Sequence, residues 1–229
     1  MEELNALCRE LSQQAGELRA QIPQQGALVT SGSVFDLCRQ AAGEYDAISR
    51  RFPILAGGYS APKPVLFSEV MSYLNITGVY FPFTAEANVN IASPDFLIPV
   101  TMCHELSHLR GFMREDEANF IAYLVCRESS DVLFEYSGTM LALIHASNAL
   151  YSADPALYEE LVQTYTPGML ADLRDNSEYW QRHEGLIGDI SDTVNDTYLK
   201  ANRQSDGVKS YGRMVDLLLA QRRLSGGLS

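Results

Sequence analysis

The sequence lacks any apolar run close to the roughly 20 residues that a transmembrane helix needs. Its first residues also lack the basic start and the apolar stretch of a secretory signal peptide. Basic residues are few, with 17 Lys and Arg against 29 Asp and Glu, so the formal net charge is −12. This charge argues against a nucleic-acid partner and against electrostatic docking to anionic lipid. We therefore expect the chain itself to be soluble and to bind no nucleic acid.

Cysteine and histidine are also scarce, with four of each in 229 residues. The cysteines form no C-x-x-C pair, which excludes a zinc knuckle and a thioredoxin-like redox motif. We expect them to be small buried hydrophobic residues; they are Cys8, Cys38, Cys103 and Cys126. The hydrophobic fraction of 46% excludes an intrinsically disordered chain. A chain of this length can form one large domain with a full hydrophobic core.

The N-terminal part of the sequence has a helical pattern. Apolar residues recur at helical spacing from Leu4 to Ile22, and Pro23 ends this helix. Ser33 can cap a second helix that extends to about Arg51. The sequence therefore predicts an N-terminal helical segment, a main domain and a flexible tail, at residues 1–52, 53–223 and 224–229.

Short β-branched and aromatic segments bounded by turn residues follow, which is typical of strands. They predict three strands, at residues 65–67, 78–83 and 88–91. Pro82 lies inside the second segment and favours an edge strand, since proline cannot donate to a β-ladder. After Ser93 the pattern is helical, with predicted helices near residues 99–110, 115–128, 130–151, 155–165, 168–182, 184–203 and 209–223. The predicted fold class is α+β, mainly helical, with a small mixed or antiparallel sheet.

One helical segment carries a metal-binding pattern, His-Glu-Leu-Ser-His, which begins at His104 and ends at His108. Residues four apart on a helix share a face, so both imidazoles can reach one Zn²⁺. Glu105 then lies beside the metal, where it can take a proton from a metal-bound water. Pro99 suits the first turn of this helix and Gly111 suits its left-handed end. The pattern predicts a zinc site on a short active-site helix; the alternative is two half-buried histidines that cap carbonyls.

A tetrahedral catalytic zinc site needs a third protein ligand and leaves its fourth position for water. The next segment offers Glu115 and Glu117, on a helix that can begin near Arg114. We expect Glu115 to be the third ligand, with Glu117 as the alternative, and Asn119 to orient a ligand. Arg114 stands where the pattern H-E-x-x-H-x-x-G-x-x-H requires histidine, which excludes that zinc class. The same acids could instead only favour a helix N-terminus through the helix dipole.

The acidic segment also resembles a known group of enzymes. Glu115, Ala118 and Asn119 match Glu-x-x-Ala-Asp/Asn, the second motif of gluzincin-type metallopeptidases, in which the first Glu binds zinc and the last residue supports a histidine. More closely, the chain resembles a bacterial family of unknown function whose members are similar to membrane-anchored zinc peptidases. The blocks that carry this resemblance are residues 78–90, 104–112, 115–120 and 210–220, and it covers roughly residues 50–223.

The resemblance implies a zincin-like fold with Zn²⁺ as the cofactor. It also implies a membrane tether, because members of the family carry transmembrane helices ahead of this domain. The sequence at hand has no such helices, so we expect it to be the extracytoplasmic soluble domain of a bacterial membrane protein. Its contact with the membrane would then be made only through a segment absent from this chain.

The predicted function is that of a zinc-dependent metallopeptidase acting on a peptide or protein substrate. In this mechanism zinc lowers the pKa of its water, and Glu105 takes the proton and passes it to the leaving amine. The oxyanion needs a donor besides the metal. Tyr211 and Arg213 are the candidate donors, although Tyr211 could equally be an ordinary half-buried aromatic at a helix start. His183 and His145 are weaker alternatives, because a lone His on an apolar helix is commonly a core residue.

Substrate binding is predicted at the strand near residues 86–91. A peptide can add to an exposed sheet edge through main-chain hydrogen bonds, and Asn88 and Asn90 suit such an edge. The same asparagines could instead form turns or satisfy buried backbone groups.

Three other functions are compatible with the sequence. The first is a sensory or interaction module with a structural zinc, although a structural site has no need of Glu105. The second is a helical scaffold that binds no metal. The third is a zinc hydrolase that acts on amides other than peptides. The sequence does not predict an oligomeric state.

Overall fold

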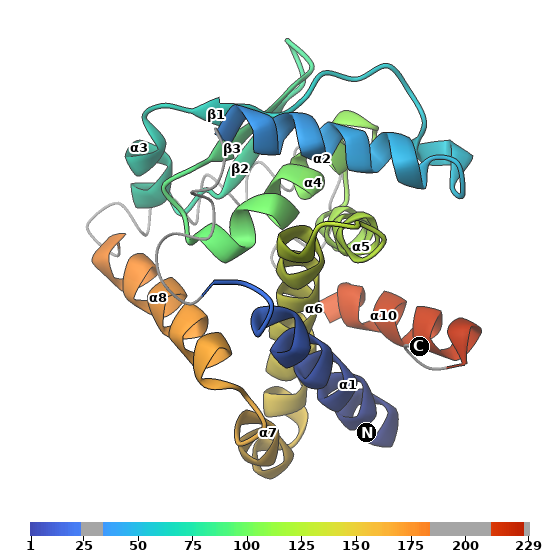
Figure 1. Ribbon diagram of the computed structural model, residues 1–229, viewed down its shortest axis with the longest axis vertical. Coiled ribbons are helices and arrows are strands. Elements are labelled where there is room, and N and C mark those ends of the chain that lie inside the picture. The colour runs from blue at the N-terminus through green and yellow to red at the C-terminus, as the bar shows by residue number, and fades with distance from the viewer. Residues whose placement is uncertain (24–33, 184–211, 227–229) are drawn as a thin grey trace.

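The computed structural model describes residues 1–23, 34–183 and 212–226 of the chain. The fold is mainly helical with one small sheet, so the predicted α+β class is confirmed (Figure 1). The helices are α1 (Glu2–Arg19), α2 (Val34–Ile48), α3 (Ser68–Tyr73), α4 (Ile98–Leu109), α5 (Glu115–Arg127), α6 (Val132–Ala153), α7 (Pro155–Val162), α8 (Pro167–His183) and α10 (Arg213–Ser225). The strands are β1 (Lys63–Val65), β2 (Gly78–Phe81) and β3 (Glu86–Asn90), and short 3₁₀ turns lie at Pro53–Leu55 and Asp95–Leu97.

The sheet is mixed, in the order β1-β3-β2, with β1 parallel and β2 antiparallel to β3. The prediction that the strand near residues 86–91 is an exposed edge is therefore wrong. β3 is the central strand, and its main-chain groups pair on both sides. Within the described residues, the edges are β1 and β2. The predicted strand at residues 78–83 ends at Phe81, so Pro82 lies in the turn that follows and not inside the strand; the expected edge position of this strand is confirmed.

The predicted strand at residues 65–67 is also wrong in position. β1 ends at Val65, and Leu66 and Phe67 are 80% and 82% exposed. The side chain of Ser68 explains the break, since its hydroxyl donates to the Val65 carbonyl at 2.5 Å and accepts from the Ile91 amide at 2.8 Å. The chain then continues as α3, a short helix that the sequence pattern did not predict.

The predicted helices agree with the structure to within a few residues wherever both are described. α10 continues to Ser225, two residues beyond its predicted end, and stops at Gly226, whose φ of 71° is left-handed. The predicted helix at 184–203 and the proposed cap Ser33 lie outside the described residues. The last three residues of the predicted tail also lie outside them.

The buried apolar side chains form two clusters. The first cluster lies among α1, α6, α7, α8 and α10, and the second joins α2, β3, α4 and α5. In the predicted N-terminal segment, α1 thus packs into the first cluster and α2 into the second. The four cysteines are free and buried, as expected. In Figure 1 the sheet and α2 form the upper part of the molecule and α1, α6, α7 and α8 the lower part.

Helix α4 is held between these parts by polar as well as apolar contacts. Tyr45 of α2 donates its hydroxyl to the Cys103 carbonyl at 2.6 Å and lies 2.7 Å from the Ser107 hydroxyl. The Arg110 guanidinium stacks over the Tyr45 ring at 3.8 Å. At the other end, the Val100 amide donates to the Ser137 hydroxyl of α6 at 3.0 Å. These contacts fix the position and the rotation of the helix that carries the His-Glu-x-x-His pattern.

Candidate metal centre

Helix α4 ends in a hydrogen-bonded turn that Gly111 makes possible. Gly111 has a φ of 91°, which favours glycine because other residues are strained there. Its amide donates to the His108 carbonyl at 2.9 Å, and the Phe112 amide donates to the Ser107 carbonyl at 3.2 Å. This pair of bonds is the Schellman arrangement that closes a helix and reverses the chain. Helix α5 can therefore begin at Glu115 and lie alongside the end of α4.

The turn brings three ligand atoms together. His104 Nε2 lies 2.9 Å from His108 Nε2. The Glu115 carboxylate lies 3.1 Å from His104 Nε2 through Oε2 and 3.5 Å from His108 Nε2 through Oε1. Among the described residues, this is the one group of three or more His, Cys, Asp or Glu side chains placed to hold a metal ion. We call His104, His108 and Glu115 the triad.

The spacing of the triad fits a small tetrahedral ion. Ligand atoms at 2.0–2.1 Å from a tetrahedral zinc lie about 3.3–3.4 Å from one another. The observed separations of 2.9, 3.1 and 3.5 Å bracket this value. The two imidazoles and one carboxylate are also the donor set of many catalytic zinc sites, which leave a fourth position open. The residues present therefore fit Zn²⁺.

Hydrogen bonds on the far side of each imidazole orient the triad. His104 Nδ1 lies 2.7 Å from the Asn119 side-chain oxygen, and His108 Nδ1 lies 2.8 Å from the Phe112 carbonyl oxygen. Both partners are acceptors, so both Nδ1 atoms donate, and in the neutral imidazoles both Nε2 atoms carry lone pairs. Two lone pairs 2.9 Å apart repel each other unless a cation lies between them. The arrangement thus selects the tautomers that metal ligation requires.

The electrostatics of the triad also favour a positive charge. Burial opposes a charge on His104, but the hydrogen bond and the charge of Glu115 outweigh it and raise the pKa of His104 to about 9. Burial alone would raise the pKa of Glu115, but hydrogen bonds from His104 and His108 hold that pKa well below its usual range. The carboxylate is therefore ionised at neutral pH, and without a metal the positive charge is a proton on an imidazole.

Glu105 lies next to the triad, but its carboxylate is not one of the three groups placed to bind a metal. Its side chain is buried, and its Oε2 atom has no hydrogen-bond partner among the described residues. Burial raises the pKa of Glu105, while the neighbouring His104 and His108 lower it. Gly78 of β2 makes room for this side chain, since a Cβ atom at Gly78 would lie 2.5 Å from Glu105 Oε1. A buried carboxylate with a free oxygen is thus confined between α4 and β2.

The structure separates the two candidates for the third ligand. Glu115 is in the triad, whereas Glu117 is half-exposed and pairs with Arg114 at 3.5 Å. Arg114 also reaches the buried Asp116 carboxylate at 3.2 Å. The first turn of α5 therefore points one acid of three at the two histidines. Asn119, one turn later, lies where the sequence predicts it, against His104.

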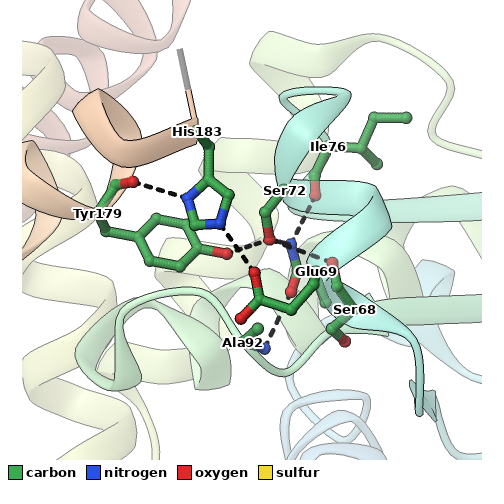
Figure 2. A network of polar contacts seen from close by, with 8 residues as sticks. Ser68, Glu69, Ser72, Ile76, Ala92, Tyr179 and His183 are labelled. Carbon is green, nitrogen blue, oxygen red and sulfur yellow. Dashed lines mark hydrogen bonds and ion pairs between the residues drawn. The ribbon is translucent and has the colours of Figure 1, made fainter. Parts of the chain in front are cut away.

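None of the other predicted residues that the structure describes is a member of the triad. His183 ends α8, where its Nε2 bonds Glu69 Oε2 at 2.8 Å and its Nδ1 bonds the Tyr179 carbonyl at 2.7 Å (Figure 2). His145 lies on α6 and Arg213 begins α10, and neither belongs to the triad. Tyr211 lies outside the described residues.

The two asparagines predicted to bind substrate lie on the central strand. The Asn90 amide is fully buried and donates to the Ser72 hydroxyl and to the Ile76 carbonyl, both at 3.0 Å. Through Ser72, Asn90 connects β3 to the contacts between α3 and α8 that Figure 2 shows. Asn88 donates to the carbonyls of Val79 and Glu86 at 3.4 and 3.3 Å. Their side chains thus satisfy backbone groups, the alternative that the sequence left open.

Two contributors to the site escaped the sequence pattern. The Phe112 carbonyl orients His108, and the left-handed Gly111 before it is the signal that could have suggested this contact. Gly78 lies beside Glu105, but 27 positions earlier in the sequence. No local pattern reports such a contact, because it depends on how the sheet packs on α4.

The comparison with protein families gives one match. A family model described as "Protein of unknown function (DUF3810)" matches residues 1–219. The chain belongs to this family. A comparison with curated proteins found no match, and a comparison with solved structures found none either. The implied relation to metallopeptidases and the implied membrane tether are no part of the DUF3810 match and stay predictions.

The contact between Asn119 and His104 gives a testable prediction for this DUF3810 chain. Asn119→Ala removes the acceptor that fixes His104, so we expect zinc affinity to fall about 10- to 100-fold. Asn119→Asp keeps an acceptor oxygen and should retain most of the affinity. Competition with a fluorescent zinc chelator measures both, and circular dichroism checks the helix content. Equal affinities for the Ala and Asp variants would show that this contact does not orient the ligand.

Proposed function

We propose that this protein is a zinc-dependent metallopeptidase. The observation that carries the proposal is Glu105, a buried carboxylate beside the triad, one oxygen of which has no hydrogen-bond partner in residues 1–23, 34–183 and 212–226. A site that only holds a metal for structure needs ligands and no such group. Two His and one Glu in the triad, with their imidazoles held by Asn119 and by the Phe112 carbonyl, add the metal-binding part.

In this proposal the residues of the site have two roles, metal binding and proton transfer. His104, His108 and Glu115 would hold Zn²⁺, which supplies a Lewis acid that polarises a carbonyl and makes water more acidic. Glu105 accepts a proton at its free oxygen from the attacking water and then donates it to the leaving amine. Its burial suits both steps, because a carboxyl with a raised pKa holds a proton more readily near neutral pH.

Strand β2, an edge of the sheet among the described residues, lies beside the site and supports a peptide as the substrate. The Asn90 amide bonds the Thr77 carbonyl at 2.9 Å, so these two residues form a hydrogen-bonded pair. Such pairs alternate along antiparallel strands, so the main-chain groups of Gly78, the next residue and the first of β2, point away from β3. An extended peptide could pair with them, and Gly78 touches Glu105. The edge used for substrate is therefore β2 in this proposal, in place of the predicted edge at residues 86–91.

Zinc content and zinc-dependent hydrolysis test the proposal together. Protein purified without chelator should contain about one zinc per chain by mass spectrometry and should cleave members of a mixed peptide library. Removal of zinc with 1,10-phenanthroline should abolish cleavage, and added zinc should restore it. Zinc without cleavage of any peptide would overturn the peptidase proposal. Protein that binds no zinc would overturn the metal site as well.

We also propose that the domain works outside the bacterial cytoplasm, tethered to the membrane by a segment that is not part of this chain. The support is the resemblance to membrane-anchored zinc peptidases. Among the described residues, no helix has both the length and the apolar content needed to cross a bilayer. Fractionation of a bacterium that carries the natural protein tests the proposal, which requires the protein in the membrane fraction and cleavage of this domain by protease added outside the cell.

A further inference from the structure

A pocket of about 430 Å³ lies between α6, α7 and α8. In Figure 1, α6 and α8 rise from α7 at the bottom of the view. The volume lies within the range of roughly 300–1,000 Å³ that is typical of small-molecule sites. Protein interiors are close-packed and leave few spaces larger than a water molecule. The side chains around this pocket must therefore keep it open.

The lining of α6 changes from apolar to polar along one face of the helix. Met140 and Leu143 are buried, and Ser147 and Asn148 follow on the same face at helical spacing. Ser147 is buried too, and its hydroxyl donates to the Ile144 carbonyl at 3.2 Å, whereas Asn148 is exposed. A large apolar side chain in place of Ser147 would fill this space. The pocket thus has an apolar floor and a polar mouth.

Helix α8 lines the other side in the same order. Leu173 is half-buried, and Asn176 and Ser177 follow it one turn later. The Asn176 side-chain oxygen accepts a hydrogen bond from Trp180 Nε1 at 3.1 Å. This bond holds the amide in place and uses only its oxygen, so the NH₂ group of Asn176 can donate to a ligand.

The described residues that line the pocket are all uncharged, although the chain carries a formal net charge of −12. Tyr165 is one of them. Burial raises the pKa of Tyr165 to about 12, although the Ser147 hydroxyl lowers it, so this side chain is a neutral donor at neutral pH. An ionised ligand would lose its hydration here without gaining an opposite charge. The lining therefore favours a neutral ligand.

We propose that this pocket binds a small neutral molecule with an aromatic or aliphatic body and one amide or hydroxyl group. The body lies against Met140, Leu143 and Leu173, and the polar group bonds the Asn176 amide. Among the described residues, the pocket shares no member with the triad. The inference is therefore independent of the proposed peptidase function.

Two compounds that differ in charge test the proposal on the full chain. 2-Naphthamide and 2-naphthoate share their ring system and nearly their shape, but only the second is ionised at neutral pH. In a titration followed by NMR, we expect 2-naphthamide to bind with a Kd below about 1 mM and 2-naphthoate to bind at least about tenfold more weakly. Equal affinities, or no saturable binding of 2-naphthamide, would overturn the proposal.

Methyl groups locate the bound compound. In protein labelled at the methionine methyl groups, 2-naphthamide should give nuclear Overhauser contacts to Met140, which lines the pocket. Met102 is the internal control, because it is equally buried but belongs to the second hydrophobic cluster. Saturable binding without contacts to Met140 would place the compound elsewhere and overturn the proposal.

A substitution at the mouth of the pocket gives a second test. Asn148→Trp should obstruct the mouth and weaken binding of 2-naphthamide at least about tenfold. Ser152→Trp is the matched control, since Ser152 is exposed one turn later on α6 and is not a lining residue, so its affinity should stay within about twofold of wild type. Equal affinities for the two folded variants would overturn the pocket as the binding site. Circular dichroism checks folding, and the contacts to Met140 decide the question if Asn148→Trp does not fold.

Discussion

Glu105→Gln is expected to lower the kcat of peptide hydrolysis by about 10²–10⁴-fold while the protein keeps its zinc. Gln has the same shape and cannot accept or donate the transferred proton, so the variant removes the chemistry and leaves the volume beside Gly78 filled. None of the three ligand atoms of the triad belongs to Glu105, so the metal content should stay at about one per chain. Steady-state kinetics on a cleaved peptide and metal analysis of the same sample measure both quantities.

Stability separates this effect from damage to the fold. Burial already disfavours the charged form of Glu105, so the neutral Gln should leave the melting temperature equal or raise it. Glu117→Gln is the control, since Glu117 is 46% exposed in its side chain and pairs with Arg114. An unchanged kcat in Glu105→Gln would remove Glu105 from the mechanism. Loss of zinc from this variant would show instead that Glu105 supports the metal.

Removal of the third ligand is the second large effect that we expect. Glu115→Ala should lower zinc affinity by more than about 100-fold and abolish zinc-dependent hydrolysis at low zinc concentration. The reason is that Glu115 supplies both the remaining ligand atom and the negative charge that offsets two desolvated imidazoles and a cation. Isothermal titration with zinc, in competition with a chelator of known affinity, measures the change.

Glu117→Ala is the matched control for that experiment. It removes an acid from the same turn of α5, and its pairing with Arg114 is at the surface, so zinc affinity should stay within about threefold of wild type. The reverse result, with affinity lost in Glu117→Ala and kept in Glu115→Ala, would contradict the triad. Equal effects of both substitutions would indicate that the acids act only through the general negative charge of the helix start.

The parts of this site that the sequence could predict are those set by local geometry. The four-residue spacing of His104 and His108 is sufficient to place both imidazoles on one face of α4, and Gly111 indicates where that helix ends. The short turn that follows limits the third ligand to the first residues of α5. The sequence favours Glu115 over Glu117 as the third ligand and excludes neither. The orientation of α5 then places Glu115, and not Glu117, against the two histidines.

The parts that the sequence could not predict depend on strand order and on packing. The side chains of the segment near residues 86–91 suit an edge strand as well as a central strand. Only the pairing of β3 with both β1 and β2 makes it central. Leu66 and Phe67 are large apolar residues that fit the pattern of a strand. The strand nevertheless ends before them, because the Ser68 hydroxyl bonds the Val65 carbonyl and the Ile91 amide. The contact of Gly78 with Glu105 is likewise a product of tertiary packing.

The short distance between the ligands along the chain has a consequence for the role of the metal. All three ligands lie within residues 104–115, so a bound ion cross-links only a small loop of the polypeptide. The entropy that such a link removes from the unfolded chain is small compared with that of a link between distant segments. The two hydrophobic clusters are built from side chains other than these ligands. In the proposed function, the protein can therefore gain and lose zinc while it stays folded, so the supply of zinc would control the proposed activity without new synthesis of the chain.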